Sequence, residues 1–428
     1  MKQLMMARRM FSISVPRSIE ASILPKCELD PSRCLVAPCS VSVQSKHHYS
    51  SPAPVTSSPI LEDKLWSKVI RYSKFRPMPL TIDTFLHHGE NSSKEESFRF
   101  LKDEIPTRLA GLLLEFNLLP DILQRQEMFQ QVRNDHFQSF KEIVNLANDS
   151  GNLDVLDAFE DILSCMRVRH ADTVHEMAEA VMGAKFEMED VGQSLDTGKI
   201  QYFLDRMYMT RISTRMLYNQ HLYVHGDNIE KARHVGQIDL YCDVAASVRK
   251  AFAEAARLCG SNYGEYPDLR VISNNKSSSE AEDVPILLAY VPSHLHHMFF
   301  EVIKNSMRAT VENTRKQGLA SLSPIRVLIS KTDVDITIKI SDQGGGIPRS
   351  QMENLFKYMY TTAGSVGKAH RDLVRNSQVP PMAGLGYGLP LSRLYARYFQ
   401  GDLDISSIHG VGTDCFIYLR SLQSNVSS

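Results

Sequence analysis

The sequence predicts an α+β protein in which an N-terminal helical bundle precedes an α/β sandwich, with helices on one face of a mixed sheet. Two observations predict this class. Residues 61–235 carry apolar side chains at spacings of three and four, and strand-like runs are scarce there. Past residue 240, short apolar and alternating runs are interleaved with helical segments and glycine turns. We therefore expect a helical domain at 60–235, a second domain at 236–422 and a short tail at 423–428.

The N-terminal segment, residues 1–59, is set apart from both domains by its composition. Its first 19 residues hold Lys2, Arg8, Arg9 and Arg17 and no acidic residue, and the remainder is rich in Ser, Pro and His. A basic, acid-poor start is typical of a mitochondrial presequence, whereas a secretory signal needs a longer unbroken apolar core. We expect a presequence here, with a disordered tail as the alternative.

Charge, hydropathy and cysteine usage narrow the function classes. The net charge of −1 gives no overall field that would attract nucleic acid. No run of 18 apolar residues occurs, so we expect no membrane span. The seven cysteines are scattered, without a close pair or a Cys/His cluster. This pattern predicts reduced thiols and no zinc site.

Four amphipathic segments make up the expected bundle. Residues 93–119, 125–147, 151–184 and 200–223 repeat the helical spacing of apolar side chains. Each such segment has an apolar face that must be buried against another helix, which is the condition that a bundle satisfies.

The second half of the chain alternates between helix and strand signals. A helix that ends at a glycine is predicted at 243–264, and a short apolar strand at 285–291. Residues 326–342 alternate apolar and polar side chains, which indicates a half-buried hairpin strand. A helix at 390–400 is followed by two strands around a glycine turn at 401–422.

The predicted helix around residues 297–310 carries a compact polar stripe. At about 100° per residue, five polar side chains fall within roughly a 100° arc, and the rest of the circumference is apolar. The five are His297, Glu301, Lys304, Asn305 and Arg308. A solvated face of a surface helix is the simplest interpretation, so the neighbouring motifs must decide whether the stripe faces a ligand.

A D-x-G-x-G motif follows the strand that ends at Asp342. The glycines Gly344, Gly345 and Gly346 come at once, and glycine permits positive φ and a close approach of the backbone to a ligand. A carboxylate at that sheet edge can accept a hydrogen bond from the exocyclic amine of adenine. A tight turn with no ligand is the alternative.

A G-x-G-x-G motif precedes the helix at 390–400. Gly384, Gly386 and Gly388 would present free N–H groups and a helix N-terminus to phosphate, although a flexible hinge is the alternative. The polar segment 364–383 before it suits a mobile lid over a nucleotide. Near the C-terminus, Gly412 and Thr413 occupy a turn, where Thr413 would contact adenine directly or through water.

The order of these motifs between Glu301 and Thr413 resembles the nucleotide-binding domain shared by bacterial histidine kinases, the large heat-shock chaperone ATPase, type II topoisomerases and mismatch-repair ATPases. This resemblance implies a GHKL-type (Bergerat) sandwich that binds ATP and Mg²⁺. In that fold the Asn of the first motif ligates Mg²⁺, which here is Asn305. The Asp of the second motif reads adenine, which here is Asp342.

The amino-acid sequences of the motifs resemble one family more closely, the mitochondrial pyruvate dehydrogenase kinases. The segments that carry this resemblance include "YVPSHLHHMFFEVIKNSMRAT", "SDQGGGIP", "LFKYMYTTA" and "GLGYGLPLSRLYARYFQGDL", together with "KFRPMPLTIDTFL" in the helical half. It extends over roughly residues 65–422. The branched-chain 2-oxoacid dehydrogenase kinase is a close relative and the nearest alternative. The resemblance implies a protein-serine kinase of the mitochondrial matrix that phosphorylates the α subunit of the first enzyme, E1, and inactivates the complex.

The same resemblance implies a role for each site residue. Glu301 would act as the general base on the serine, and His297 would orient and polarise it. Lys304 and Arg308 would offer positive charge to phosphate, although Arg308 has a structural ion pair as its alternative. The implied ATP contacts are Glu301, Val302, Ile303, Lys304, Asn305, Ser306, Met307, Arg308, Asp342, Gly344, Gly346, Thr361, Thr362, Gly384, Leu385, Gly386, Tyr387, Gly388, Leu389 and Thr413.

The family also implies partners and a regulatory pocket. A pocket for pyruvate-like inhibitors would involve His170 and Arg211. Dimerisation through the sheets of the ATP domains is expected. Many members dock the lipoyl domain of the E2 core with the help of a C-terminal tail that carries an Asp-Trp pair. This chain stops soon after Leu422 and its only tryptophan is Trp66, which puts tail-mediated docking in question.

Three other functions stay open at the level of sequence. A histidine-kinase mechanism would pass phosphate through His170, but Ala171 follows where a phosphoacceptor box has an acid, so a satisfied histidine of the bundle is the better interpretation. A sensor or chaperone-type ATPase would hydrolyse ATP without serine transfer. A degenerate binding module would lack the intact set of Glu301, Asn305 and Asp342.

Overall fold

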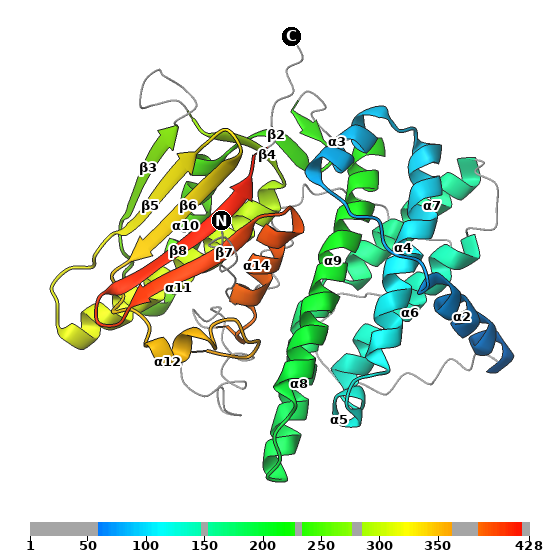
Figure 1. Ribbon diagram of the computed structural model, residues 1–428, viewed down its shortest axis with the longest axis horizontal. Coiled ribbons are helices and arrows are strands. Elements are labelled where there is room, and N and C mark those ends of the chain that lie inside the picture. The colour runs from blue at the N-terminus through cyan, green and yellow to red at the C-terminus, as the bar shows by residue number, and fades with distance from the viewer. Residues whose placement is uncertain (1–58, 147–152, 227–232, 276–284, 362–383, 422–428) are drawn as a thin grey trace, which may run out of the picture.

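The computed structural model describes residues 59–146, 153–226, 233–275, 285–361 and 384–421. The expected presequence, the expected lid segment 364–383 and the expected tail at 423–428 lie outside these residues, except for position 59. The described part consists of a helical half and an α/β half that lie side by side (Figure 1). None of the described helices combines the length and the hydropathy that a membrane span requires.

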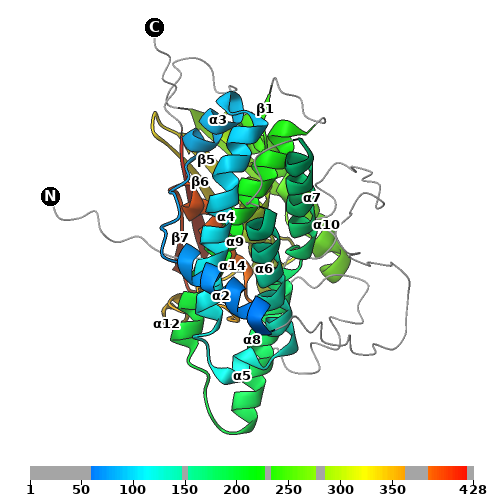
Figure 2. The same cartoon turned by 90° about the vertical axis from the view of Figure 1, so that its right-hand side faces the viewer.

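The helical half is an all-α bundle, as the spacing of apolar residues predicts. Its long helices α4, α6 and α9 run roughly alongside one another, with α4 packed against both α6 and α9 (Figure 2). The elements are α2 (Pro59–Tyr72), α3 (Ile82–Asn91), α4 (Lys94–Phe116), α5 (Asp121–Gln124), α6 (Glu127–Leu146), α7 (Leu153–Arg169), α8 (Thr173–Asp190) and α9 (Thr197–His225).

Local sequence signals set where these helices begin. Ser93 and Glu96 form a reciprocal capping box at the start of α4, in which Ser93 Oγ accepts from the Glu96 N–H and the Glu96 carboxylate accepts from the Ser93 N–H. Asp196 caps α9 by accepting from the N–H groups of Gly198 and Lys199. These side chains satisfy amide groups that have no partner within the helix.

The α/β half contains a five-stranded mixed sheet in the order β3-β5-β6-β8-β7, in which β3 and β5 are parallel and the other neighbouring strands are antiparallel. A smaller antiparallel sheet has the order β1-β2-β4. The elements are β1 (His234–Val235), β2 (Ile238–Asp243), α10 (Val244–Tyr263), β3 (Leu269–Asn275), β4 (Leu287–Tyr290), α11 (Pro292–Gln317), β5 (Ile325–Lys331), β6 (Asp335–Asp342), α12 (Arg349–Met352), α14 (Gly388–Tyr398), β7 (Asp402–Ile408) and β8 (Gly412–Arg420).

Helices cover one face of the large sheet, as predicted. Ile336, Ile338 and Ile340 alternate along β6 and are fully buried beneath α11, which packs on β5 and β6. The opposite face is open, since Leu328 of β5 is 39% exposed. This alternation is the period-two pattern of a sheet with one covered face.

Strands β1, β2 and β3 do not follow from the sequence patterns. Among the described strands β3 lies at the edge of its sheet and pairs with β5, and its exposed Ile272 and polar neighbours give no clear alternation. The β1–β2 hairpin is short and turns at Gly236, whose φ is 61°. It spans the boundary expected between 235 and 236, and the domain limits themselves stay a prediction.

Candidate active site

The polar stripe lies on α11, a helix whose ends are set by Pro292 in its first turn and by Gly318, which adopts a left-handed φ of 65° after the last turn. The stripe is not a solvated face. Glu301 is 1% exposed and Lys304 2% exposed, and Lys304 Nζ lies 2.5 Å from Glu301 Oε2. Charged side chains are almost never so buried unless they are paired, so the interpretation as a surface helix is excluded for these two residues.

Burial gives the Glu301 carboxyl group an unusual proton affinity. Desolvation raises its pKa from 4.5 to about 7, against the opposing attraction of Lys304. A carboxylate with a pKa near neutrality can both hold and release a proton under physiological conditions. That property is what a general base needs.

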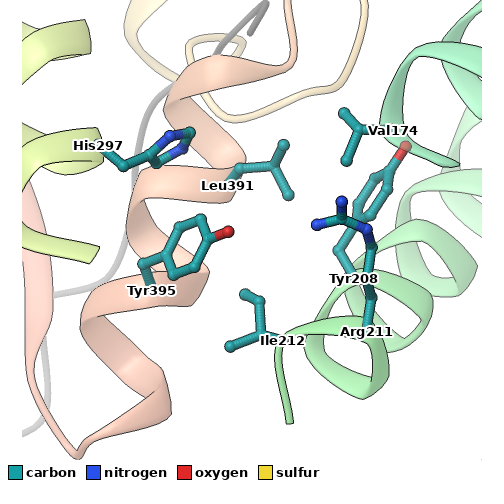
Figure 3. A pocket seen from close by; sticks show the side chains of 7 residues that line it. All are labelled: Val174, Tyr208, Arg211, Ile212, His297, Leu391 and Tyr395. Atoms are coloured by element: carbon teal, nitrogen blue, oxygen red, sulfur yellow. The ribbon is translucent and has the colours of Figure 1, made fainter. Parts of the chain in front are cut away.

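His297 lies one turn before Glu301 and lines a cavity between the two halves of the molecule (Figure 3). The cavity has a volume of about 10 Å³, roughly the room that one water molecule needs. The His297 ring packs against Tyr395 of α14 with ring centroids 4.7 Å apart, and its Nε2 is buried with no hydrogen-bond partner among the described residues. Burial lowers the pKa of His297 well below 6.5, so the ring is neutral. Its expected role in orienting Glu301 stays a prediction.

Asp342 lies at the end of β6 and is tied to α11. Its carboxylate accepts hydrogen bonds from Ser306 Oγ at 2.9 Å and from the Gly344 N–H at 2.9 Å. Burial raises its pKa to about 6, which these hydrogen bonds oppose. The carboxylate is thereby held in one orientation, as a group that reads one edge of a base must be.

Thr413 is the residue of β8 that pairs with Asp342 in the sheet register. Its hydroxyl lies 2.9 Å from Ser407 Oγ, and Ser407 Oγ also accepts from the Ile347 N–H at 2.8 Å. The structure therefore brings together the two residues that the sequence assigned to adenine. Ser407 supports both of the turns involved, and no motif pointed to it.

The glycines of the D-x-G-x-G motif allow the turn to lie directly against α11. A Cβ atom on Gly344 would stand 2.4 Å from Ala309 Cβ, and Asn313 Nδ2 donates to the Gln343 carbonyl at 3.1 Å. Gly344 is thus required by packing between helix and turn. The sequence patterns also did not indicate that Asn313 holds this turn, because its position one turn beyond the stripe matches no motif.

We expect Gly344→Ala to lower the free energy of unfolding by about 1–3 kcal/mol, because the added methyl group overpacks a contact with the α11 backbone. Urea denaturation would measure this. Gly111→Ala is the matched control. Gly111 lies inside α4, and apart from its chain neighbours and the backbone of its own helix no described atom comes within 4 Å of where its Cβ would stand, so alanine there should stabilise by about 0.5–1 kcal/mol. Equal stability of the two variants would contradict the packing role.

The G-x-G-x-G motif forms the approach to α14, as predicted. Gly388 and Leu389 begin the helix, and Tyr387 precedes it as a buried residue. Gly386 has a φ of 80°, and its carbonyl accepts from the Met359 N–H at 3.1 Å. The chain segments on either side of residues 362–383 therefore meet each other here, which places Thr361 close to the glycine loop.

Several predicted contacts can be placed only in part. Asn305 is partly exposed and lies on α11 between Lys304 and Ser306. Val302, Ile303 and Met307 are buried in the core, and their contact with ATP stays a prediction. Arg308 donates to Glu312 at 2.9 Å, the structural ion pair left open as its alternative. Thr362 lies outside the described residues.

His170 and Arg211, assigned to a regulatory pocket, lie together in the bundle. Arg211 Nη2 donates to the carbonyls of His170 and Ala171, at 3.3 and 3.1 Å. The His170 ring is 2.8 Å from Ser139 Oγ, is 5% exposed, and has its pKa lowered by burial. A ring that is enclosed and hydrogen-bonded in the bundle is poorly placed to attack the γ-phosphate, which disfavours the histidine-kinase mechanism.

Comparisons with known proteins agree with this geometry. Residues 290–423 match the family model of the histidine kinase-, DNA gyrase B- and HSP90-like ATPases. Residues 79–239 match the model of the mitochondrial branched-chain alpha-ketoacid dehydrogenase kinase. The human [pyruvate dehydrogenase (acetyl-transferring)] kinase isozyme 3, a mitochondrial protein, is 44% identical over 371 residues, which cover 85% of this chain and 88% of the relative. The chain belongs to the mitochondrial pyruvate dehydrogenase kinase family.

Two other members of the family match this chain to a similar extent. The Drosophila melanogaster [pyruvate dehydrogenase (acetyl-transferring)] kinase is 43% identical over 83% of this chain and 84% of its own length. The Ascaris suum kinase of the same name is 42% identical over 84% of this chain and 87% of its own length. This member of the pyruvate dehydrogenase kinase family is therefore mitochondrial and carries an ATP-binding domain of the histidine-kinase-like type.

Proposed function

We propose that this kinase transfers the γ-phosphoryl group of ATP to a serine of the E1 α subunit of the pyruvate dehydrogenase complex in the mitochondrial matrix, and so inactivates the complex. The observation that carries the proposal is the buried Glu301–Lys304 pair on α11. The same helix reaches the adenine-reading carboxylate through Ser306. One helix thus joins the proposed base to the proposed nucleotide site.

The chemistry needs little more than position and charge. The serine oxygen forms a bond to the γ-phosphorus while the bond from that phosphorus to the β–γ bridging oxygen breaks, and the serine proton passes to Glu301. Lys304, already beside Glu301, places a positive charge close to the reacting phosphoryl group. Such positioning and electrostatic stabilisation supply most of the catalysis in phosphoryl transfer.

The donor set also fits a Mg²⁺ ion held mainly by the nucleotide. Over the described ranges, no three His, Cys, Asp or Glu side chains gather closely enough to hold a metal ion by themselves. Mg²⁺ commonly takes one or two protein oxygens together with phosphate oxygens and water. The carboxamide of Asn305, partly exposed beside Lys304, is the proposed protein ligand. A metal ion bound there would neutralise phosphate charge.

Two partners are proposed with the substrate. The open face of the large sheet carries apolar side chains in register, since Ile272 of β3 pairs with Leu328 of β5 and both are exposed. Tyr418 of β8 adds to the same face. These residues support a homodimer that forms through the sheets. Docking of the E2 lipoyl domain on the helical half stays a prediction.

The test is incubation of the purified protein with labelled ATP, Mg²⁺ and either the pyruvate or the branched-chain 2-oxoacid dehydrogenase complex, followed by mapping of the labelled residues. We expect label on serines of the pyruvate E1 α subunit, with matching loss of complex activity. Preferential label on the branched-chain subunit would reassign the substrate. Nucleotide hydrolysis without label, or acid-labile phosphohistidine on the kinase, would overturn the proposal.

The raised pKa of Glu301 predicts a pH dependence. A base works only when ionised, so kcat/KM for the protein substrate should rise with pH through about 7 and fall nearly tenfold per unit below it. The affinity for ADP should instead fall as the pH drops below about 6, because the Asp342 carboxylate that accepts from adenine then becomes protonated. Measuring the two profiles separately distinguishes the groups. A kcat/KM profile that is flat between pH 6 and 8 would contradict the assignment of the base.

A further inference from the structure

One face of α9 grips the chain segment that leads to the proposed ATP contact Thr361. Gln201 Nε2 donates to the Phe356 carbonyl at 3.0 Å, while its Oε1 accepts from the Tyr358 N–H at 3.0 Å. One turn later, Asp205 Oδ1 accepts from the Tyr358 hydroxyl at 2.8 Å. A single side chain and its neighbour thus hold residues 356–358 through three hydrogen bonds.

The same face of α9 also reaches the glycine motif. Tyr208, one turn beyond Asp205, packs with Tyr358 and Tyr387, and the three ring centroids are 5.1 to 6.2 Å apart. Tyr387 lies inside the G-x-G-x-G motif, and the Met359 N–H donates to Gly386. The two chain segments that contribute proposed nucleotide contacts are therefore tied to each other and to α9.

The contacts between α9 and residues 356–358 are partly buried, and they pair polar groups of both sides. Tyr358 and Tyr387 are 5% and 1% exposed, and burial raises the pKa of the Asp205 carboxyl. The amide of Gln201 uses its donor and its acceptor on one stretch of main chain, as a neighbouring strand would. Replacing Gln201 by Leu, Glu or Ala would remove at least one of its two hydrogen bonds to the main chain of residues 356–358.

Neither Gln201 nor Asp205 belongs to the α/β half that carries the nucleotide motifs. Both lie on α9, which also carries Tyr208, Arg211 and Ile212 of the cavity that His297 lines (Figure 3). The bundle therefore contacts the α/β half at two adjacent places, the glycine motif and the start of the catalytic stripe.

We propose that Gln201 and Asp205 are positioning residues of the helical half that set the geometry of the nucleotide loop through Tyr358. The inference rests on the proposed function, because it takes Gly384–Leu389 and Thr361 as ATP contacts. Neither residue touches the reacting atoms. Loosening either one displaces the main chain that receives the nucleotide, so the effect falls on ATP affinity rather than on the chemical step.

The test compares Tyr358→Phe, which removes only a hydroxyl group, with Tyr263→Phe. Tyr263 donates to Glu312 at 2.8 Å, the same kind of hydrogen bond at the same length as the one between Tyr358 and Asp205. We expect Tyr358→Phe to raise the KM for ATP and the Kd for ADP about 3- to 10-fold, a change typical of the loss of one hydrogen bond, with kcat within about twofold of wild type. Tyr263→Phe should change neither.

Four further variants separate positioning from general stability. Asp205→Asn keeps an acceptor for the Tyr358 hydroxyl and should stay near wild type, whereas Asp205→Ala should match Tyr358→Phe. The double variant Asp205→Ala/Tyr358→Phe should be no weaker in ATP affinity than either single variant, because both remove the same interaction. Gln201→Leu should raise the KM for ATP while kcat is retained.

The outcomes distinguish this inference from the function on which it rests. A wild-type protein that fails to bind ADP overturns both. A wild type that binds ADP and labels E1 α, beside Tyr358→Phe and Gln201→Leu with unchanged KM for ATP, overturns the positioning role alone. A lowered melting temperature with unchanged KM would likewise assign the contacts to stability only.

Discussion

Glu301→Gln should lower kcat about 10²- to 10⁴-fold and leave the affinity for ATP close to that of wild type. The carboxamide keeps the shape of the side chain and can still accept from Lys304, but it cannot take a proton from serine. The buried position makes the loss larger than at a surface site, because bulk water has little access to the carboxylate and does not readily replace it as the base. Single-turnover labelling of E1 α, with ADP binding measured in parallel, checks both halves of the prediction.

A control near the other end of α11 guards against a trivial loss of fold. Glu265→Gln breaks the ion pair with Arg315 of that helix, where both side chains are about half exposed. An exposed pair contributes little to stability, so this variant should retain full activity. If Glu301→Gln transferred phosphate at more than a tenth of the wild-type rate, Glu301 would not be the base.

Asp342→Ala should weaken ATP binding about 10- to 150-fold, because it removes a charged acceptor that would bind the exocyclic amine of adenine. It should also shrink the preference for ATP over GTP. Guanine presents a carbonyl oxygen at the position of that amine, and a carboxylate repels it. Calorimetric titration with ADP and GDP measures both effects.

Asp335 provides the matched control for this variant. It lies on the same strand, β6, at the opposite and exposed end. Asp335→Ala should leave nucleotide affinity unchanged. An Asp342→Ala protein that bound ADP as tightly as wild type would show that the carboxylate serves only to hold Ser306 and the Gly344 N–H.

The fold was predictable wherever one local period dominates. The alternation of Ile336, Ile338 and Ile340 identified β6, and the spacing of three and four identified the bundle. Strand β3 was not predicted, because an edge strand with one partner needs no regular alternation of apolar and polar residues. Its pairing with β5 also joins segments that are about fifty residues apart in the sequence. Such pairing is decided by tertiary contacts rather than by local preference.

The sequence predicted which of the proposed site residues lie near one another better than it predicted their side-chain partners. Asp342 and Thr413 were both assigned to adenine from separate motifs, and the sheet register places them opposite one another. Arg308 belonged to the same polar arc as Glu301, yet it pairs with Glu312 along the helix. A position on a helical wheel gives the direction in which a side chain leaves the helix axis, and it does not say which other side chain it will contact.

The amino-acid sequence alone determined the family, the order of the nucleotide motifs and the helix that carries Glu301, because these depend on which residues follow one another. Only the tertiary structure decided that Glu301 and Lys304 are enclosed together and that α9 holds Tyr358 from the other half of the molecule. The physical reason is that desolvation and long-range hydrogen bonds depend on what surrounds a side chain in space. A proton affinity near neutrality is therefore a property of the folded protein rather than of the residue.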